Sequence, residues 1–224
     1  MDRKEHAVLI NIKDLSWSYP NGHHLVFDHF NFALYKGDFV VVQGKSWTGK
    51  TTLVHFLIGN HQVPARTMYH GQEDMSKFSA SEMQRYRKSI GVVFQDYKLL
   101  DWLTVKENIS YPLKIAGLWQ SLIDMQVKKV AHLLHLEDSL NTPVEVLSGW
   151  HKQKVGIARA LVTNPEFIIA DEPTGNLDRE ETKKVADTLL DLNAQGITIV
   201  FVTHDVHLIE YMKLKNSHIT VQSM

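Results

Sequence analysis

The stretch Phe39–Thr52, FVVVQGKSWTGKTT, decides the fold of this chain. It opens with an apolar run typical of a buried strand, and TTLVHFLIG from Thr51 onward has helical spacing. Between them, Gly44–Thr51 matches the pattern G-x-x-x-x-G-K-[ST], in which backbone N–H groups at a helix N-terminus wrap phosphates. The sequence therefore predicts a phosphate-binding loop here, and an ordinary glycine turn is the weaker alternative.

The residue types in this loop indicate a nucleoside triphosphate with a divalent cation. We expect Lys50 to reach the β- and γ-phosphates of this nucleotide and the Thr51 hydroxyl to ligate Mg²⁺. A nucleoside triphosphate and Mg²⁺ are thus the predicted cofactors. The expected nucleotide-binding residues of the loop are Gly44, Lys45, Ser46, Trp47, Thr48, Gly49, Lys50, Thr51 and Thr52.

A second polar feature ends the apolar stretch FIIADE, residues 167–172. A buried strand here delivers Asp171 and Glu172 at its carboxyl end, the edge at which ligands bind in parallel sheets. Taken alone, the pair fits a solvated acidic turn equally well. Beside a phosphate loop, we expect Asp171 to hold Mg²⁺ and Glu172 to polarise the attacking water as general base.

The rest of the chain alternates strand and helix patterns. Residues 9–19 and 24–34 are predicted antiparallel strands joined by a turn at Asn21–Gly22, and GVVF, EFIIAD and ITIVFVTHD are predicted buried strands. Residues 96–160 have mostly helical patterns, with VKKVAHLLHLEDSL (127–140) the clearest amphipathic segment. The fold class is therefore α/β with a mainly parallel sheet.

Composition limits the possible partners. The 224 residues contain no cysteine, which excludes disulfides, and a net charge of -1 argues against a nucleic-acid partner. No apolar stretch reaches the roughly 18 to 20 residues of a membrane helix, and the N-terminus lacks a signal-peptide core. We expect a cytoplasmic protein that reaches a membrane only through another chain.

Several further motifs stand in one order along nearly the whole chain, and together they resemble the ABC ATPase family. Leu147-Ser148-Gly149 followed by VGIARAL resembles the ABC signature, Pro173–Asp178 resembles the segment leading into the D-loop, and Thr203-His204-Asp205 resembles the switch-histidine loop. Phe94-Gln95 resembles the Q-loop, and Tyr19 stands where the family has an adenine-stacking aromatic.

This resemblance implies a P-loop NTPase core with an N-terminal antiparallel β subdomain and an inserted α-helical subdomain. It also implies one nucleotide-binding domain over residues 1–224, with the helical insert at about 96–160. Two such domains are expected to pair head to tail, most simply as a homodimer, with ATP between them. The implied roles are γ-phosphate contact in trans for Ser148 and Gly149, γ-phosphate binding for His204, organisation of the partner's site for Asp178, Mg²⁺ sensing for Gln95 and adenine stacking for Tyr19.

One segment resembles a particular branch of the family. Residues 90–117, IGVVFQDYKLLDWLTVKENISYPLKIAG, are most similar to the cell-division FtsE branch, and ADEPTGNLD also fits the wider group with LolD and MacB. The resemblance implies an integral membrane permease as partner, FtsX-like in that branch, and a place on the inner face of the cell membrane. Lipoprotein release and drug or peptide export are the alternative roles.

Two tryptophans depart from the family pattern. Trp47 and Trp150 stand where glycines are expected, and the signature continues as LSGWHK, residues 147–152. Because glycine allows close approach and unusual backbone angles, either tryptophan could reduce activity. Alternatively both indoles point away and activity is near normal, or UGA codons that mean glycine have been written as tryptophan.

These departures keep a second class of function open, a regulatory ATP-binding module that closes on ATP but hydrolyses it poorly. Intact Glu172 and His204 argue against it. A soluble ABC ATPase of DNA or ribosomes usually carries coiled coils, zinc cysteines or tandem domains, which this sequence lacks. A P-loop kinase leaves the signature and switch motifs unexplained.

Overall fold

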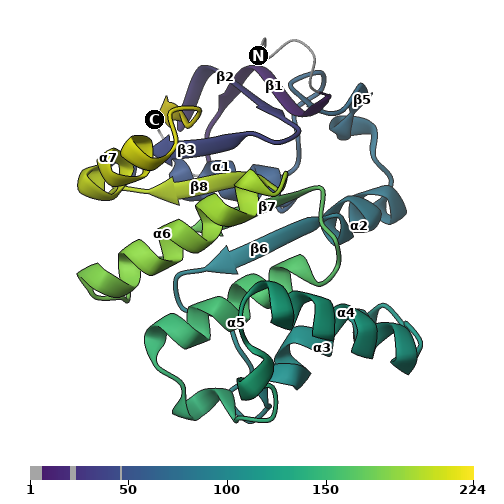
Figure 1. The fold of residues 1–224 in the computed structure, drawn as a ribbon. Coiled ribbons are helices and arrows are strands. Elements are labelled where there is room, and N and C mark those ends of the chain that lie inside the picture. Colours follow the sequence, from purple (N-terminus) through teal and green to yellow (C-terminus); the bar gives the residue numbers. More distant parts are fainter. Residues whose placement is uncertain (1–6, 21–23, 46) are drawn as a thin grey trace.

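The computed structural model describes residues 7–20, 24–45 and 47–224, and two sheets organise this part of the chain (Figure 1). A parallel sheet has the strand order β6-β7-β8-β3-β9, and an antiparallel sheet has the order β2-β1-β4-β5. The strands of the parallel sheet are β3 (Phe39–Gln43), β6 (Ile90–Phe94), β7 (Phe167–Asp171), β8 (Thr198–Thr203) and β9 (Thr220–Ser223).

The parallel sheet is the core of the molecule, as its apolar runs predict. Every residue of β8 is buried, and so are the first four residues of β3 and of β7. Strands buried on both faces need covering layers, and helices supply them on the two sides of this sheet (Figure 1). The predicted α/β class is confirmed.

The antiparallel sheet confirms the first two predicted strands. β1 (Val8–Trp17) and β2 (Phe27–Tyr35) pair antiparallel, whereas the predicted turn at Asn21–Gly22 lies outside the described residues. Two short strands that the sequence pattern did not predict complete the sheet, β4 (Met68–His70) and β5 (Glu73–Asp74).

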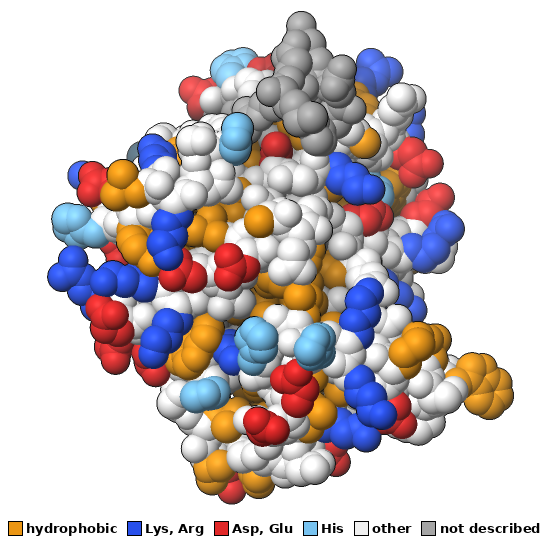
Figure 2. Space-filling view, in the orientation of Figure 1, with side chains coloured by type: hydrophobic (Ala, Val, Ile, Leu, Met, Phe, Trp, Pro, Cys, Tyr) orange, Lys and Arg blue, Asp and Glu red, His pale blue; other side chains and the backbone are white. Residues whose placement is uncertain are grey.

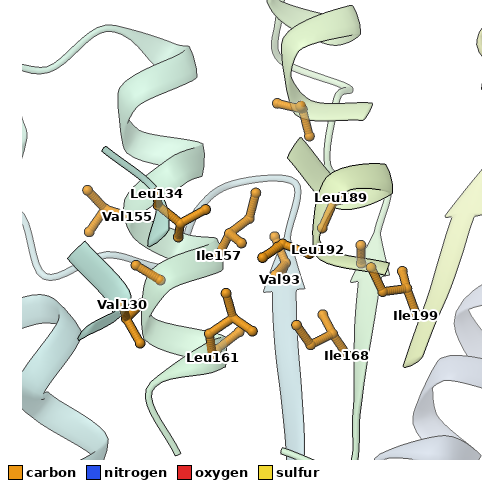
Figure 3. Packing of buried hydrophobic residues seen from close by; sticks show 14 of the residues in the cluster. Val93, Val130, Leu134, Val155, Ile157, Leu161, Ile168, Leu189, Leu192 and Ile199 are labelled. Carbon is orange, nitrogen blue, oxygen red and sulfur yellow. The ribbon is translucent and has the colours of Figure 1, made fainter. Parts of the chain in front are cut away.

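Helices cover the parallel sheet and form a separate layer beyond β6. A helical layer next to that edge strand contains α3, α4 and α5 (Figure 1). In Figure 3, Ile157 of α5 lies between Leu134 and Val93 of β6, and all three belong to one apolar core that joins this layer to the sheet. The helices are α1 (Lys50–Leu57), α2 (Ala80–Lys88), α3 (Val105–Ile115), α4 (Gln120–Leu133), α5 (Gly149–Leu161), α6 (Arg179–Ala194) and α7 (Val206–Lys215).

The amphipathic segment 127–140 is only partly helical, which corrects its predicted length. The helix α4 ends at Leu133, because His135 takes a left-handed backbone conformation with φ 52°. The chain then makes a short 3₁₀ turn at Glu137–Ser139.

The surface mixes charges of both signs. Figure 2 shows Lys and Arg side chains interspersed with Asp and Glu over the face drawn, in keeping with the net charge of -1. Within residues 7–20, 24–45 and 47–224, no helix combines the length and apolar character that a bilayer crossing demands.

Candidate active site

The predicted phosphate loop runs from the carboxyl end of β3 to the first residue of α1. Two glycines shape it. A Cβ on Gly44 would lie 2.4 Å from Thr48 Oγ1, and Gly49 has a φ of 98°, which suits a residue without a side chain. Loop and helix start thus have the geometry that exposes backbone N–H groups to an anion.

Lys50 is buried in this loop, with 8% of the residue exposed. Its Nζ donates hydrogen bonds to the carbonyl oxygens of Gly44 at 2.7 Å and Lys45 at 2.9 Å. The same ammonium lies 3.8 Å from Glu172 Oε1, so it joins the loop to the end of β7.

The carboxyl ends of β7 and β8 bring three predicted site residues together. Glu172 follows β7 in a left-handed conformation with φ 45°, and its backbone N–H donates to the Val202 carbonyl of β8 at 3.0 Å. His204 follows β8, and its Nδ1 lies 3.0 Å from each carboxylate oxygen of Glu172. One carboxylate therefore contacts both Lys50 and His204.

Asp171 sits beside this group at the last position of β7. Burial raises the pKa of its carboxyl and the neighbouring Glu172 raises it further, while His55 and Lys50 act in the opposite direction. A cation at this position would remove the electrostatic strain between the two carboxylates, because it would favour the ionised form of Asp171.

The two candidate Mg²⁺ ligands, the Asp171 carboxylate and the Thr51 hydroxyl, offer oxygen atoms, which fit Mg²⁺. Thr51 is exposed in the first turn of α1, and Mg²⁺ typically takes one or two protein oxygens together with phosphate and water. Within the described ranges, no group of three or more His, Cys, Asp or Glu side chains could hold a metal by itself. The chain thus offers part of a Mg²⁺ shell rather than a complete cage.

Gln95, the third predicted metal residue, has a different neighbour. It follows Phe94, whose strand partner is Asp171, but its amide Nε2 contacts Asn176 Oδ1 at 3.4 Å. Asn176 Nδ2 in turn donates to the Gln95 carbonyl at 3.0 Å. The side chain of Gln95 is therefore paired with the segment after β7.

Tyr19 lies near the start of α1, where the resemblance implies an adenine. Its hydroxyl is 3.1 Å from the Thr52 hydroxyl, and its ring packs edge-on against Trp17 with centroids 4.6 Å apart. Tyr19 remains 43% exposed, so one aromatic side chain next to the loop is open to a ligand.

The residues predicted to act in trans lie apart from the phosphate loop. Ser148 is the N-cap of α5, with Gly149 as the first helical residue, and Asp178 is the N-cap of α6. Among the described residues, no hydrogen bond or ion pair joins these three to the loop of the same chain. They form a second surface at the N-termini of two helices.

The two tryptophans have different environments. Trp47 has a φ of 73° and is fully exposed, so its indole does not cover the loop. Trp150 is half-buried, packs against the large core cluster and lies under Lys154, whose Nζ is 5.3 Å from the ring centroid. Ser46 lies outside the described residues.

Sequence reasoning missed two residues in this region. Asn176 holds Gln95, and the Glu181 carboxylate contacts the backbone of Trp150 in α5. The spacing Asp178-x-x-Glu181 is a helix-start signal that could have drawn attention to Glu181, although not to its contact with another helix.

Comparison with known proteins identifies the family. Residues 27–175 match the family model described as ABC transporter. The chain is 36% identical over 205 residues to the cell division ATP-binding protein FtsE of Bacillus subtilis, covering 92% of this chain and 90% of that protein. It is also 36% identical over 203 residues to the methionine import ATP-binding protein MetN 2 of Bacillus thuringiensis, of which it spans 59%.

Solved structures agree with these matches. The cassette cbiO1 of Clostridium perfringens, part of the ABC transporter complex cbiONQ, has a TM-score of 0.84 at 25% identity, with coverage of 92% of this chain and 82% of that one. A dimeric ATP-binding cassette in a post-hydrolysis state with ADP and Pi has a TM-score of 0.75 at 29% identity, with coverage of 89% and 90%. The chain has the P-loop NTPase fold and belongs to the ABC transporter family as an ATP-binding subunit close to the FtsE branch.

Proposed function

We propose that this chain binds Mg²⁺ and ATP at the β3–α1 loop, hydrolyses the ATP, and works as a single nucleotide-binding domain with a helical insert at about 96–160. The observation that carries the proposal is the contact of one carboxylate, Glu172, with both Lys50 at 3.8 Å and His204 at 3.0 Å. One relative, solved in a post-hydrolysis state with ADP and Pi, supports hydrolysis for the family.

Each residue of this group has a distinct role in the proposal. Lys50 exchanges the carbonyl oxygens of its own loop for the β- and γ-phosphate oxygens of ATP. Glu172 accepts a proton from the attacking water, and His204 orients that carboxylate and binds the γ-phosphate. Thr51 and Asp171 would hold Mg²⁺ with Gln95 as a sensor, and the bound ion would supply charge neutralisation at the phosphates.

The proposal predicts the behaviour of Glu172→Gln. This variant keeps ATP binding but loses turnover by roughly 10²- to 10⁴-fold, because the amide cannot accept the proton. Phosphate release and ATP titration on the purified proteins measure the two properties separately. Wild-type turnover in Glu172→Gln would remove Glu172 from this role.

We further infer that two copies pair head to tail on ATP. Ser148, Gly149 and Asp178 lie at the N-termini of α5 and α6, and no hydrogen bond or ion pair joins them to the loop of their own chain in the described structure. A helix N-terminus favours a phosphate, so the γ-phosphate of the second copy is the matching ligand. The dimeric relative supports pairing of two such domains.

The membrane partner in our proposal docks in an apolar groove between β6 and α3. The groove has a volume of about 620 Å³ and includes Phe94, Tyr111 and Ile115 in its lining. Ile115 is 69% exposed, and Phe94 directly precedes Gln95, so this groove connects the surface with the site. The FtsE relatives favour an FtsX-like permease at the inner face of the cell membrane, with cell division as the setting.

The FtsE role has competitors that share the same ATP chemistry, namely lipoprotein release, drug or peptide export and, from the MetN matches, methionine import. Purification of the complex from membranes in detergent identifies the permease. An FtsX-like chain in that complex would support the cell-division role. A different permease would contradict that role and indicate the one to which the permease belongs.

One observation favours a weakly hydrolysing regulatory module instead. Trp47 holds a left-handed conformation inside the phosphate loop, a state that is costly for a residue with a Cβ. The turnover assay distinguishes the hydrolysing subunit from the regulatory module, since a regulatory module would bind ATP and pair without measurable phosphate release.

A further inference from the structure

The N-terminus of α5 is already occupied by side chains of the same protein. The first turn of any helix leaves backbone N–H groups without partners in the helix. In α5, the N–H of Trp150 donates to Glu181 Oε1 at 3.4 Å, and the N–H of His151 donates to Ser148 Oγ at 3.4 Å. Ser148 Oγ also lies 2.8 Å from His151 Nδ1. Two backbone donors of the first turn and the Ser148 hydroxyl are thus engaged internally.

Glu181 takes an unusual direction for its position in the sequence. In α2 and α3 the acid three residues after the N-cap bonds back to that cap, as Glu82 does to the Ser79 N–H and Glu107 does to the Thr104 N–H. Asp178 and Glu181 have the same spacing at the start of α6. The Glu181 side chain instead reaches α5, so it forms a tertiary contact in place of the local capping box.

The surroundings keep the Glu181 carboxylate over the first residues of α5. A Cβ on Gly149 would lie 2.8 Å from Leu177 Cδ2, 3.0 Å from the Tyr97 hydroxyl and 3.5 Å from Glu181 Oε2. The pKa of Tyr97 is raised by burial and, next in size, by the Glu181 carboxylate. Three segments therefore meet at this point, the loop after β6, the start of α5 and the start of α6.

A carboxylate and a phosphate cannot share the positive end of one helix at low cost. Both are anions, and like charges at an interface repel by several kcal/mol when they are brought into contact. The bond to Trp150 is long, which makes it weak enough for a stronger anion to replace. Pairing must therefore displace Glu181 from α5.

We propose that Glu181 is an internal competitor for the phosphate-binding end of α5, an autoinhibitory contact that ATP-driven pairing has to open. The contact between the Glu181 carboxylate and the Trp150 N–H is what the second copy's γ-phosphate replaces. The inference rests on the proposed head-to-tail pairing, and it makes Glu181 a regulator of pairing rather than a catalytic residue.

The test compares Glu181→Gln with Glu180→Gln, each combined with Glu172→Gln to prevent turnover. Glutamine has the length of glutamate and retains an oxygen acceptor, so the cap of α5 is preserved. Glu180 is the matched control, because it lies in the same first turn of α6 and is exposed, and among the described residues its side chain pairs with Lys183, at 3.0 Å. Sedimentation velocity with Mg²⁺ and ATP measures pairing, and ATP titration of dilute protein measures monomer affinity.

We expect Glu181→Gln to strengthen pairing by at least about tenfold while monomer ATP affinity stays the same, and Glu180→Gln to pair like its parent. Equal gains in pairing for both variants would show that the loss of one negative charge explains the effect, and would overturn the inference. Weaker pairing in Glu181→Gln would overturn it too, by making Glu181 a support of the signature loop. If the parent pairs and Glu181→Gln does not differ from it, only this inference falls. If no variant pairs, the head-to-tail proposal falls with it.

Discussion

Residue 47 has a backbone conformation that suits glycine better than tryptophan. Its φ is 73°, and a left-handed conformation costs an L-residue roughly 1–2 kcal/mol. The indole makes no compensating contact, because it is fully exposed. The loop therefore keeps its course at the expense of local strain, which fits the interpretation that glycine is the natural residue here.

Trp47→Gly is accordingly expected to improve ATP binding by the isolated monomer. Relief of roughly 1 kcal/mol of strain corresponds to about fivefold in affinity if the bound loop holds residue 47 in this conformation and the free loop in solution can relax it. Isothermal titration measures the change. Unchanged or weaker binding would mean that the bound loop is no more strained at residue 47 than the free loop.

Trp150 lies on the surface at the N-termini of α5 and α6, so Trp150→Gly should have a different effect from Trp47→Gly. We expect stronger ATP-driven pairing with nearly unchanged monomer affinity, because residue 150 lies at the start of α5 and not in the phosphate loop. The indole also packs on the core and under Lys154, so the variant should lose about 1 kcal/mol or more of stability. A shift in monomer affinity without a change in pairing would contradict the trans position of α5.

Lys50→Ala should greatly weaken ATP binding, since it removes the only buried ammonium of the described part of the loop. Lys36→Ala is the control, because it deletes an exposed ammonium outside the phosphate loop. Isothermal titration of both variants should separate them clearly. Equal affinity for Lys50→Ala and the parent would contradict the phosphate-binding role of this residue.

At the scale of elements, one buried side chain fixes the start of α3. Asn108 is fully buried, accepts from the Leu100 N–H at 2.8 Å and donates to the carbonyl oxygens of Leu100 and Thr104 at 3.0 and 3.1 Å. It ties the loop after β6 to the helix that lines the groove.

Asn108→Ala should therefore lower the free energy of unfolding by about 1–3 kcal/mol, because buried backbone groups lose their partner. Urea unfolding followed by circular dichroism measures the loss. Lys129→Ala on the exposed face of α4 is the control and should stay within about 0.5 kcal/mol of the parent. A similar small value for Asn108→Ala would show that water replaces its bonds.

The sequence predicts the long or strongly patterned elements and misses the short ones. The continuous apolar runs at β3, β7 and β8 predict buried strands directly, because strands buried on both faces need continuous apolar residues. β5 has two residues and β9 four, too few for a period to show. The end of α4 depends on the φ of His135, a choice that tertiary packing makes.

At the scale of the whole molecule, the site joins segments that are far apart in the chain. Motifs identify Lys50, Asp171, Glu172 and His204 from the sequence, because parallel strands deliver their carboxyl ends to one edge. The contacts between them do not follow from motifs. Pairing of Gln95 with Asn176 and of Glu181 with α5 depends on how loops and helices pack, which no local pattern encodes.

The position of β9 in the sheet determines when, during synthesis, the strand that leads into the phosphate loop gains both of its neighbours. β3, which leads into the phosphate loop, pairs with β8 on one side and β9 on the other, and the Met224 N–H donates to the Gln43 carbonyl at 2.8 Å. The ribosome synthesises the phosphate loop early. However, β3 cannot pair with strands on both sides until residues 198–223 have left the ribosome. Chains that lack residues 198–223 would thus carry the nucleotide motif on an unpaired strand edge.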